Sequence, residues 1–214
     1  MTGRVETADG KVYELPALLE WRLRRTGGVP CDSFRVKCLY SAEMGEVLKA
    51  ACRFAATENG VTRFRGVIDE WSAVCGAEGA VLTVEGRGMA ALLLDNEAEA
   101  VTYQRAALSE ILKDHAAACG VAWEPRGGSC RRVVYVPSRS VNELRYTGRY
   151  QIEKSAEDAR ELTTTLAGSV DAEPMDRVEL SLARLGVRGT FRVSETLHTL
   201  SASGETTELT LWEV

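Results

Sequence analysis

Residues 61–74, VTRFRGVIDEWSAV, and residues 80–85, AVLTVE, decide the fold class of this chain. Both runs are rich in β-branched and aromatic residues, which favour β-strands. Gly66 lies inside the first run, and a central glycine is typical of a bulge or bend in a curved sheet. Gly76 and Gly79 predict the turn between the two runs. We therefore expect two strands joined by a turn in a β-rich fold.

The same pattern extends outward over the first part of the chain, from residue 12 to about residue 85. Residues 33–40, SFRVKCLY, alternate polar and apolar side chains, which predicts a strand with one face in water. Asn59-Gly60 stands between two strand-like runs and is a strong signal for a hairpin turn. This region therefore predicts short strands separated by tight turns.

The middle of the chain, from residue 88 to residue 120, changes to a helical pattern. Residues 89–94 predict one short apolar turn of helix. A second helix is predicted over residues 106–118, because one set of side chains falls near helical spacing on a single face. This set is Leu108, Ile111, Leu112, His115 and Cys119. Gly120 is well placed to end the helix in a left-handed conformation.

The β pattern returns from residue 131 to the end. Strands are predicted at residues 133–136, 178–182, 190–194 and 206–211. Ser203-Gly204 predicts a turn before the last of these, and residues 126–129 predict a linker. Short strands at this spacing favour closed or nearly closed barrels.

Composition excludes several classes of protein. The chain has 214 residues, of which 45% are apolar and 27% charged, an ordinary globular balance. Acidic residues outnumber basic ones by 31 to 26, which disfavours a domain that grips phosphates. The N-terminus predicts no signal peptide and no apolar run is long enough to span a membrane, so we expect a soluble protein.

The six cysteines are expected to be reduced, acting as small hydrophobes; they are Cys31, Cys38, Cys52, Cys75, Cys119 and Cys130.

The run from Gly86 to Ala91 spells G-x-G-x-x-A, the dinucleotide-binding fingerprint. In that interpretation the glycines bring the backbone close to a pyrophosphate at a helix N-terminus. The fingerprint requires a βαβ unit, however, and the surrounding pattern is that of an antiparallel sheet. We therefore interpret Gly86 and Gly88 as parts of a tight strand-to-helix turn, where glycine permits a positive φ.

Asp95, Asn96, Glu97 and Glu99 form a short polar run after the first predicted helix. Neighbouring carboxylates can hold a hard cation or transfer protons, but the calcium-loop pattern is missing. The alternative is structural: Asn96 ends the helix, and the acids face water or pair with an arginine. We favour the structural interpretation.

His115 and Cys119 lie four residues apart, and Cys130 follows them. These are zinc donors, but a structural zinc site uses four ligands and His198 is the only other histidine. We expect His115 and Cys119 to pack the helical segment onto a barrel instead. Two basic clusters are interpreted as rim charges or contacts between subunits rather than a nucleic-acid site; they are Arg22, Arg24 and Arg25, and Arg126, Arg131 and Arg132.

Several runs resemble, in family order, the baseplate hub family of contractile phage tails, prophages and related injection machines, the late-control-protein-D-like group. The most specific run is GRGMAALLLDNEA at residues 86–98. Residues 64–70 precede it, and residues 189–193 and 204–211 resemble the second barrel of the family. The motif positions are structural: Gly66, Asp69, Gly86, Arg87, Gly88, Asp95, Asn96, Glu97, Gly189 and Gly204.

The resemblance implies a β-rich α+β fold with two tube-type β-barrels and a small helical insert. The first barrel is expected over residues 1–86, the insert and linker over 87–130, and the second barrel over 131–214. Longer family members carry more sequence where residues 121–149 stand, so functions of that middle portion are not expected here.

The resemblance also implies the function. Three copies would form a ring of six barrels that adapts the tail tube to the trimeric spike, without catalysis, cofactor or metal. The expected partners are the chain itself as a homotrimer, the tail tube protein and spike or other baseplate proteins, with no membrane and no sequence-specific nucleic acid. The expected location is the virion tail or injection-machine baseplate, assembled in the bacterial cytoplasm, and the ring is expected to carry more Asp and Glu on its lumen than outside.

Two alternatives remain open. The first is a barrel-type, OB-like binding module for single-stranded nucleic acid or oligosaccharide. The second is a dinucleotide-dependent enzyme built on residues 86–91.

Overall fold

The computed structural model describes residues 1–27, 31–77, 79–97, 99–103, 106–122 and 161–213. The first part contains β1 (Thr2–Thr7), β2 (Val12–Glu14), β3 (Leu18–Thr26), β4 (Ser33–Leu39), α1 (Ala42–Leu48), β5 (Ala51–Glu58), β6 (Val61–Gly76) and β7 (Gly79–Gly88). The insert contains α2 (Ala91–Asp95) and α3 (Leu108–Ala118). The last part contains β8 (Glu161–Ala167), β9 (Arg177–Leu182), the 3-10 turn η1 (Ala183–Leu185), β10 (Val187–Ser201) and β11 (Gly204–Glu213).

The described strands form one 11-stranded sheet in the order β2-β1-β5-β6-β7-β4-β3-β10-β11-β8, and β9 pairs with residues 187–192 of β10, before the segment that pairs with β3. Every pairing is antiparallel. Within the described residues the order ends at β2 and β8 without closing by hydrogen bonds. The prediction of a β-rich fold is thus confirmed, and the division into two barrels stays a prediction.

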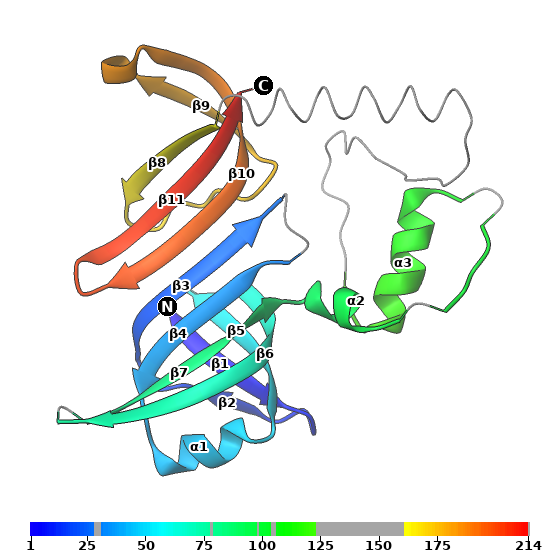
Figure 1. Ribbon diagram of the computed structural model, residues 1–214, viewed down its shortest axis with the longest axis vertical. Coiled ribbons are helices and arrows are strands. Elements are labelled where there is room, and N and C mark those ends of the chain that lie inside the picture. The colour runs from blue at the N-terminus through cyan, green and yellow to red at the C-terminus, as the bar shows by residue number, and fades with distance from the viewer. Residues whose placement is uncertain (28–30, 78, 98, 104–105, 123–160, 214) are drawn as a thin grey trace.

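Two separate cores underlie this single sheet, which Figure 1 shows as two halves with the insert to one side. The first core is assembled from strands β1 to β7 and helix α1, because alternate side chains of each strand point to the same face. Its largest buried members include Phe34, Phe54 and Leu82. The second core is smaller and consists of Ala172, Phe191, Val193, Leu209 and Leu211.

The local predictions with a clear turn signal are confirmed. Asn59 and Gly60 adopt positive φ values of 50° and 80° and join β5 to β6 as a hairpin. Strand β4 alternates buried and exposed residues as its sequence predicts. Helix α3 begins within two residues of its predicted start, and Gly120 follows its end with φ of 67°. Gly204 supplies the last turn with φ of 109°.

Three features differ from the predictions. Helix α1 interrupts the region predicted as strands, where the Ser41 side chain accepts a hydrogen bond of 3.1 Å from the Met44 backbone N–H and caps the helix. Gly66 is not a bulge: the register shifts in β6 fall instead at Arg63 and Asp69. Strand β7 continues through Gly88, so the predicted turn over residues 86–91 is confined to residues 89 and 90.

Some predictions lie outside the described residues. These are the strand at 133–136, the linker at 126–129, Cys130, and the basic cluster Arg126, Arg131 and Arg132. The five described cysteines are free, and burial raises the pKa of the Cys38 thiol to about 11, in keeping with its interpretation as a small hydrophobe. Among the helices that the structure describes, none is long and apolar enough to cross a membrane.

Candidate functional site

The junction between the two halves is a backbone ladder. Strand β3 of the first half pairs with β10 of the second from Thr26↔Glu195 to Trp21↔Leu200. Arg24 adds a two-pronged ion pair to Glu195, with N–O distances of 2.7 and 2.6 Å. Arg25 donates to Glu173 at 2.8 Å. Arg24 and Arg25 therefore make contacts inside the chain, while the interpretation of the cluster with Arg22 as rim charges or contacts between subunits stays a prediction.

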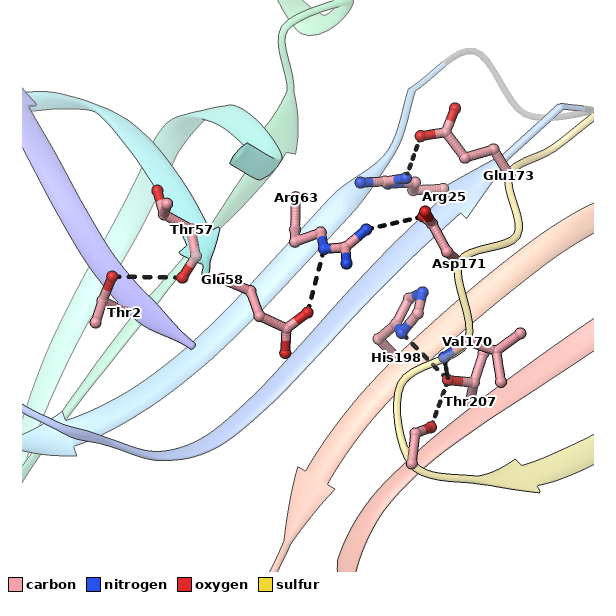
Figure 2. Close-up of polar contacts among 11 residues, drawn as sticks. Thr2, Arg25, Thr57, Glu58, Arg63, Val170, Asp171, Glu173, His198 and Thr207 are labelled. Atoms are coloured by element: carbon pink, nitrogen blue, oxygen red, sulfur yellow. Dashed lines mark hydrogen bonds and ion pairs between the residues drawn. The ribbon is translucent and has the colours of Figure 1, made fainter. Parts of the chain in front are cut away.

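Arg63 joins the halves at a second point, as Figure 2 shows. It is the extra residue of a bulge in β6, because Ala56 pairs with Phe64 and Thr57 with Thr62. A bulge re-aims the side chain that it carries. The Arg63 guanidinium donates to Glu58 at 3.1 Å and to Asp171 of the second half at 2.8 Å.

Thr207 holds the loop that carries Asp171. Its hydroxyl donates to the Gly168 carbonyl at 2.7 Å and accepts from the Val170 N–H at 3.0 Å. The His198 Nδ1 atom lies 3.3 Å from the same oxygen. Because the only hydroxyl proton is already donated to Gly168, Nδ1 carries a proton and donates, and the Nε2 atom of a neutral His198 is unprotonated.

His198 is the titratable centre of this junction. Burial lowers its pKa below the ordinary value, and the cations of Arg25 and Arg63 lower it further. Glu58 and Asp171 act in the opposite direction but less strongly. The neutral imidazole is therefore the form that this arrangement favours. The sequence analysis named His198 only as the second histidine of the chain and did not predict that it lies at this junction.

The motif glycines of the first half permit close packing of strands. A β-carbon on Gly86 would overlap the Val67 carbonyl oxygen and lie 2.7 Å from Phe34 Cε1, and one on Gly66 would overlap the Arg87 carbonyl oxygen. Across the sheet Gly86 pairs with Phe34 and Gly66 with Phe54. The rings of Phe34 and Phe54 stack at 4.3 Å over this region. Neither glycine has the positive φ that a tight turn would require.

Three charged motif residues, Asp69, Arg87 and Asp95, meet at one cluster that ties the insert to the sheet. Asp69 is the extra residue of the second bulge in β6, and Arg87 donates to both of its carboxylate oxygens at 2.8 Å. Arg87 also donates to Asp95 at the end of α2, at 3.0 and 2.7 Å. These bonds lower the pKa of Asp95. Asn96 Nδ2 donates to the Leu92 carbonyl at 2.6 Å and ends the helix, as predicted.

The remaining motif residues lie apart from this cluster. Gly88 sits against Asp32, whose Cβ would lie 2.9 Å from an added β-carbon. Glu97 is exposed and makes no polar contact with the described residues. Gly189 pairs with Leu180 in the second half, and Gly204 forms the β10–β11 turn. The motif set is therefore a group of structural positions rather than one site.

The dinucleotide hypothesis does not fit this geometry. Gly86 and Gly88 lie within β7, where they pair with neighbouring antiparallel strands instead of opening toward a helix N-terminus. The fingerprint needs a parallel βαβ unit, and every described pairing is antiparallel. We conclude that the glycines pack strands.

The residues weighed as zinc donors do not form a metal site within the described part of the chain. The described residues hold no group of three or more His, Cys, Asp or Glu side chains that could bind a metal ion. The His115 ring lies edge-on to Tyr103, with ring centres 6.4 Å apart. Figure 1 shows α3 to one side of the sheet, and the packing of this helix onto a barrel stays a prediction.

A groove of about 510 Å³ opens on the polar face of strands β3, β4, β7 and β6. Three arginines and three carboxylates line it: Arg22, Arg24, Arg35, Asp69, Glu70 and Glu85. Arg24 is already paired with Glu195, and Arg35 lies 3.4 Å from Glu85. Trp21 is buried on the opposite face from Arg22, as strand alternation predicts. Phe34 is the aromatic residue among those that line the groove, and its ring is stacked on Phe54 in the first core.

Comparison with known proteins finds solved structures with a similar fold. No family model and no curated protein matches the sequence. A solved tail protein from Neisseria meningitidis matches with a TM-score of 0.73 at 15% identity, over 99% of this chain and 96% of that one. A 43 kDa tail protein of prophage MuSo2 from Shewanella oneidensis matches with a TM-score of 0.65 at 11% identity, over 99% and 98%.

A third solved structure comes from a secretion machine. It is an E. coli component of the type VI secretion system, described as similar to the T4 tail proteins gp27 and gp5. It matches with a TM-score of 0.63 at 12% identity, over 92% of this chain and 73% of that one. The chain thus has the fold of phage tail proteins. The resemblance to the hub and tail family is confirmed at the level of the fold.

Proposed function

We propose that this chain is a structural protein of a phage tail or of a tail-like contractile injection machine. One observation carries the proposal: a single antiparallel run, β6-β7-β4-β3-β10-β11-β8, passes through both halves and holds them in one fixed arrangement. The fold shared with tail proteins supports the same conclusion. Such a protein acts through its shape, without catalysis or a cofactor.

Within that class we assign the role of baseplate hub. The two cores correspond to two tube-type barrels, over residues 1–86 and 131–214, with the insert and linker at 87–130. Three copies then supply six barrels, and the homotrimer matches a six-fold tail tube on one side and a three-fold spike on the other. Its partners are the tube protein and spike or other baseplate proteins, and it assembles in the bacterial cytoplasm.

In this arrangement the polar face of the run lines the channel of the ring. Some of its charges are paired within the chain, as between Lys37 and Glu20 at 2.7 Å and between Arg35 and Glu85 at 3.4 Å. Each such pair reduces the positive charge available to hold a passing phosphate backbone. The expectation of a net acidic lumen follows from the same hypothesis, and a ring whose lumen is basic would contradict it.

The test measures assembly rather than activity. The purified chain is mixed with the tube and spike proteins of the same machine, and complexes are isolated by size exclusion and imaged. We expect rings with a central hole that co-purify with both proteins. A monomer that binds neither protein but binds single-stranded oligonucleotide in a salt-sensitive manner would refute the hub role and favour the OB-like alternative. Fluorescence anisotropy at low and high salt measures that binding directly.

A further inference from the structure

His198 has one ring nitrogen that the hydrogen bonds of the junction do not use. Its Nδ1 atom donates to the Thr207 hydroxyl at 3.3 Å, and Nε2 has no hydrogen-bond partner among the described residues. Figure 2 shows Nε2 on the side of the ring that faces Asp171. The two side chains line one small cavity, of about 10 Å³, which Arg25 and Arg63 line as well. A proton bound at Nε2 would therefore lie beside one carboxylate and two cations.

The charged groups around His198 come from several parts of the fold. They are Arg25 on β3, Glu58 on β5, Arg63 on β6, and Asp171 and Glu173 in the loop before β9. Met1, at the N-terminus, also lines the cavity, and β11 contributes the uncharged Thr207. The Arg63 guanidinium donates to Glu58 at 3.1 Å and to Asp171 at 2.8 Å. The Arg25 guanidinium donates to Glu173 at 2.8 Å. These carboxylates are already paired, so a charged ring gains one of them by an exchange of partners.

Asp171 is the carboxylate placed to make that exchange. Among the described residues that line the cavity, it is the one acidic side chain. Its side chain is 75% exposed, so it can turn without disturbing either core. Its loop stays beside the ring, because the Thr207 hydroxyl bonds to the backbone of Gly168 and of Val170.

The exchange would change which parts of the chain are joined. Arg63 lies on β6 of the first half, whereas Asp171 and His198 both belong to the second half. The pair of Arg63 with Asp171 is thus a contact between the halves, and a pair of His198 with Asp171 would be a contact within one of them. The ladder of β3 with β10 and the pair of Arg24 with Glu195 take no part in the exchange.

We propose that His198 is an acid-sensitive latch at this junction: a proton taken up at Nε2 moves Asp171 from Arg63 to His198, and the two halves lose one of the contacts between them. The proton comes from the solvent, and the Nε2–H bond is the one covalent bond that forms. Nδ1 keeps its hydrogen bond to Thr207, and Arg63 keeps its partner Glu58. The inference concerns the junction itself and does not depend on the tail role.

The direction of the switch follows from the surroundings of the ring. With Asp171 held by Arg63, burial lowers the pKa of His198, and the cations of Arg25 and Arg63 lower it further. Once Asp171 is its partner, the charged ring is stabilised by a carboxylate, so the pKa of His198 is higher in the released form. The form that binds the proton more readily gains as the pH falls. The latch is therefore closed above the pKa of the released form. It is fully open once the pH has fallen below the pKa of the closed form, which lies under the ordinary 6.5.

NMR of the full chain follows the ring directly. The nitrogen shifts of His198 show when Nε2 takes up its proton. In wild type we expect a hydrogen-bonded Nε2–H signal, slow to exchange with water, to appear as the ring becomes charged. In Asp171→Asn the ring should still titrate, but its Nε2–H should exchange rapidly, because a neutral amide is a weaker acceptor than a carboxylate.

A cycle of variants separates partner exchange from simple charge repulsion. Arg63→Gln removes a nearby cation and frees Asp171, so it should raise the pKa of His198. In a chain that also carries Asp171→Asn there is no carboxylate to free, so the same change should raise this pKa by less. Arg25→Gln is the matched control, because it also removes a neighbouring cation but the carboxylate that it frees is Glu173. Its effect on the pKa of His198 should be the same with and without Asp171→Asn.

Several outcomes would overturn the latch. If Arg63→Gln shifts the pKa of His198 equally with and without Asp171→Asn, Arg63 acts on the ring by charge alone. A pKa of His198 that Arg63→Gln leaves unchanged would refute any competition between the two side chains. An Nε2–H that exchanges rapidly in wild type whenever the ring is charged contradicts the pair with Asp171, and so does equal protection of Nε2–H in Asp171→Asn.

Discussion

Replacement of Gly86 with alanine tests whether the motif glycines pack strands. The added β-carbon would overlap the Val67 carbonyl oxygen of β6 and lie 2.7 Å from Phe34 Cε1 and 3.0 Å from Phe34 Cζ. The carbonyl belongs to the backbone, so rotation of a side chain cannot relieve the overlap. Strands β6 and β7 must separate, and the Phe34 ring must leave its stack on Phe54.

The expected loss has three parts. Forced overpacking of a core costs about 1–3 kcal/mol, and a disrupted aromatic pair costs about 0.5–1.5 kcal/mol. A weakened backbone hydrogen bond between β6 and β7 adds about 1 kcal/mol. Because these terms overlap, we expect the free energy of unfolding of the first half to fall by about 2–4 kcal/mol. At a urea dependence near 2 kcal/mol/M, the midpoint should fall by about 1–2 M.

The assay is urea unfolding followed by tryptophan fluorescence, with Gly189→Ala as the matched control. Gly189 is also a motif glycine in a strand, but an added β-carbon there would meet only Phe191 Cε2 at an ordinary 3.7 Å. Alanine normally stabilises a strand interior by about 0.5–1 kcal/mol relative to glycine. Gly189→Ala should therefore be neutral or slightly stabilising. Equal midpoints for wild type and Gly86→Ala would refute the packing argument, and so would an equal loss in both variants.

Three further predictions concern the polar contacts. Thr207→Val should lower the free energy of unfolding by about 1–3 kcal/mol, because it leaves a backbone N–H and a carbonyl of the adjoining loop without partners; urea midpoints measure this. The lowered pKa of His198 makes the native state prefer the neutral ring, so stability is complete above pH 6.5 and falls as the pH drops below it. His198→Gln should flatten that decline in thermal melts at pH 7 and pH 5. Arg87→Gln should raise the pKa of Asp95 in an NMR titration and speed amide exchange in α2; unchanged exchange would contradict its role in holding the insert.

The parts of the fold that could be predicted are set by neighbours in sequence. Asn59-Gly60 forms its hairpin because both residues tolerate a positive φ, and Gly120 ends α3 for the same reason. The alternation of β4 is visible in its own seven residues. Helix α1 was missed although Ser41 is a good N-cap, because seven residues give too short a period to stand out among strands.

The candidate site depended on partners far away in the sequence. The bulges that carry Arg63 and Asp69 exist only relative to β5 and β7, and nothing in the local sequence marks them. Arg24 and Glu195 are 171 residues apart, so no local pattern could pair them. The resemblance placed Asp69, Arg87 and Asp95 in one motif set, but only the structure shows that they touch.

The contacts at the junction of the two halves are relevant to the proposed function. The ion pairs at the junction are partly exposed, as for Arg24 with 49% of its side chain in solvent, and such pairs contribute little to stability. They nonetheless fix geometry, because a two-pronged arginine pair and a backbone ladder from Trp21 to Thr26 allow one relative position of the halves. A binding module does not need arginines that fix its two halves relative to each other. The proposed adaptor would need them, because every copy must hold its two halves at the same angle for a ring to close.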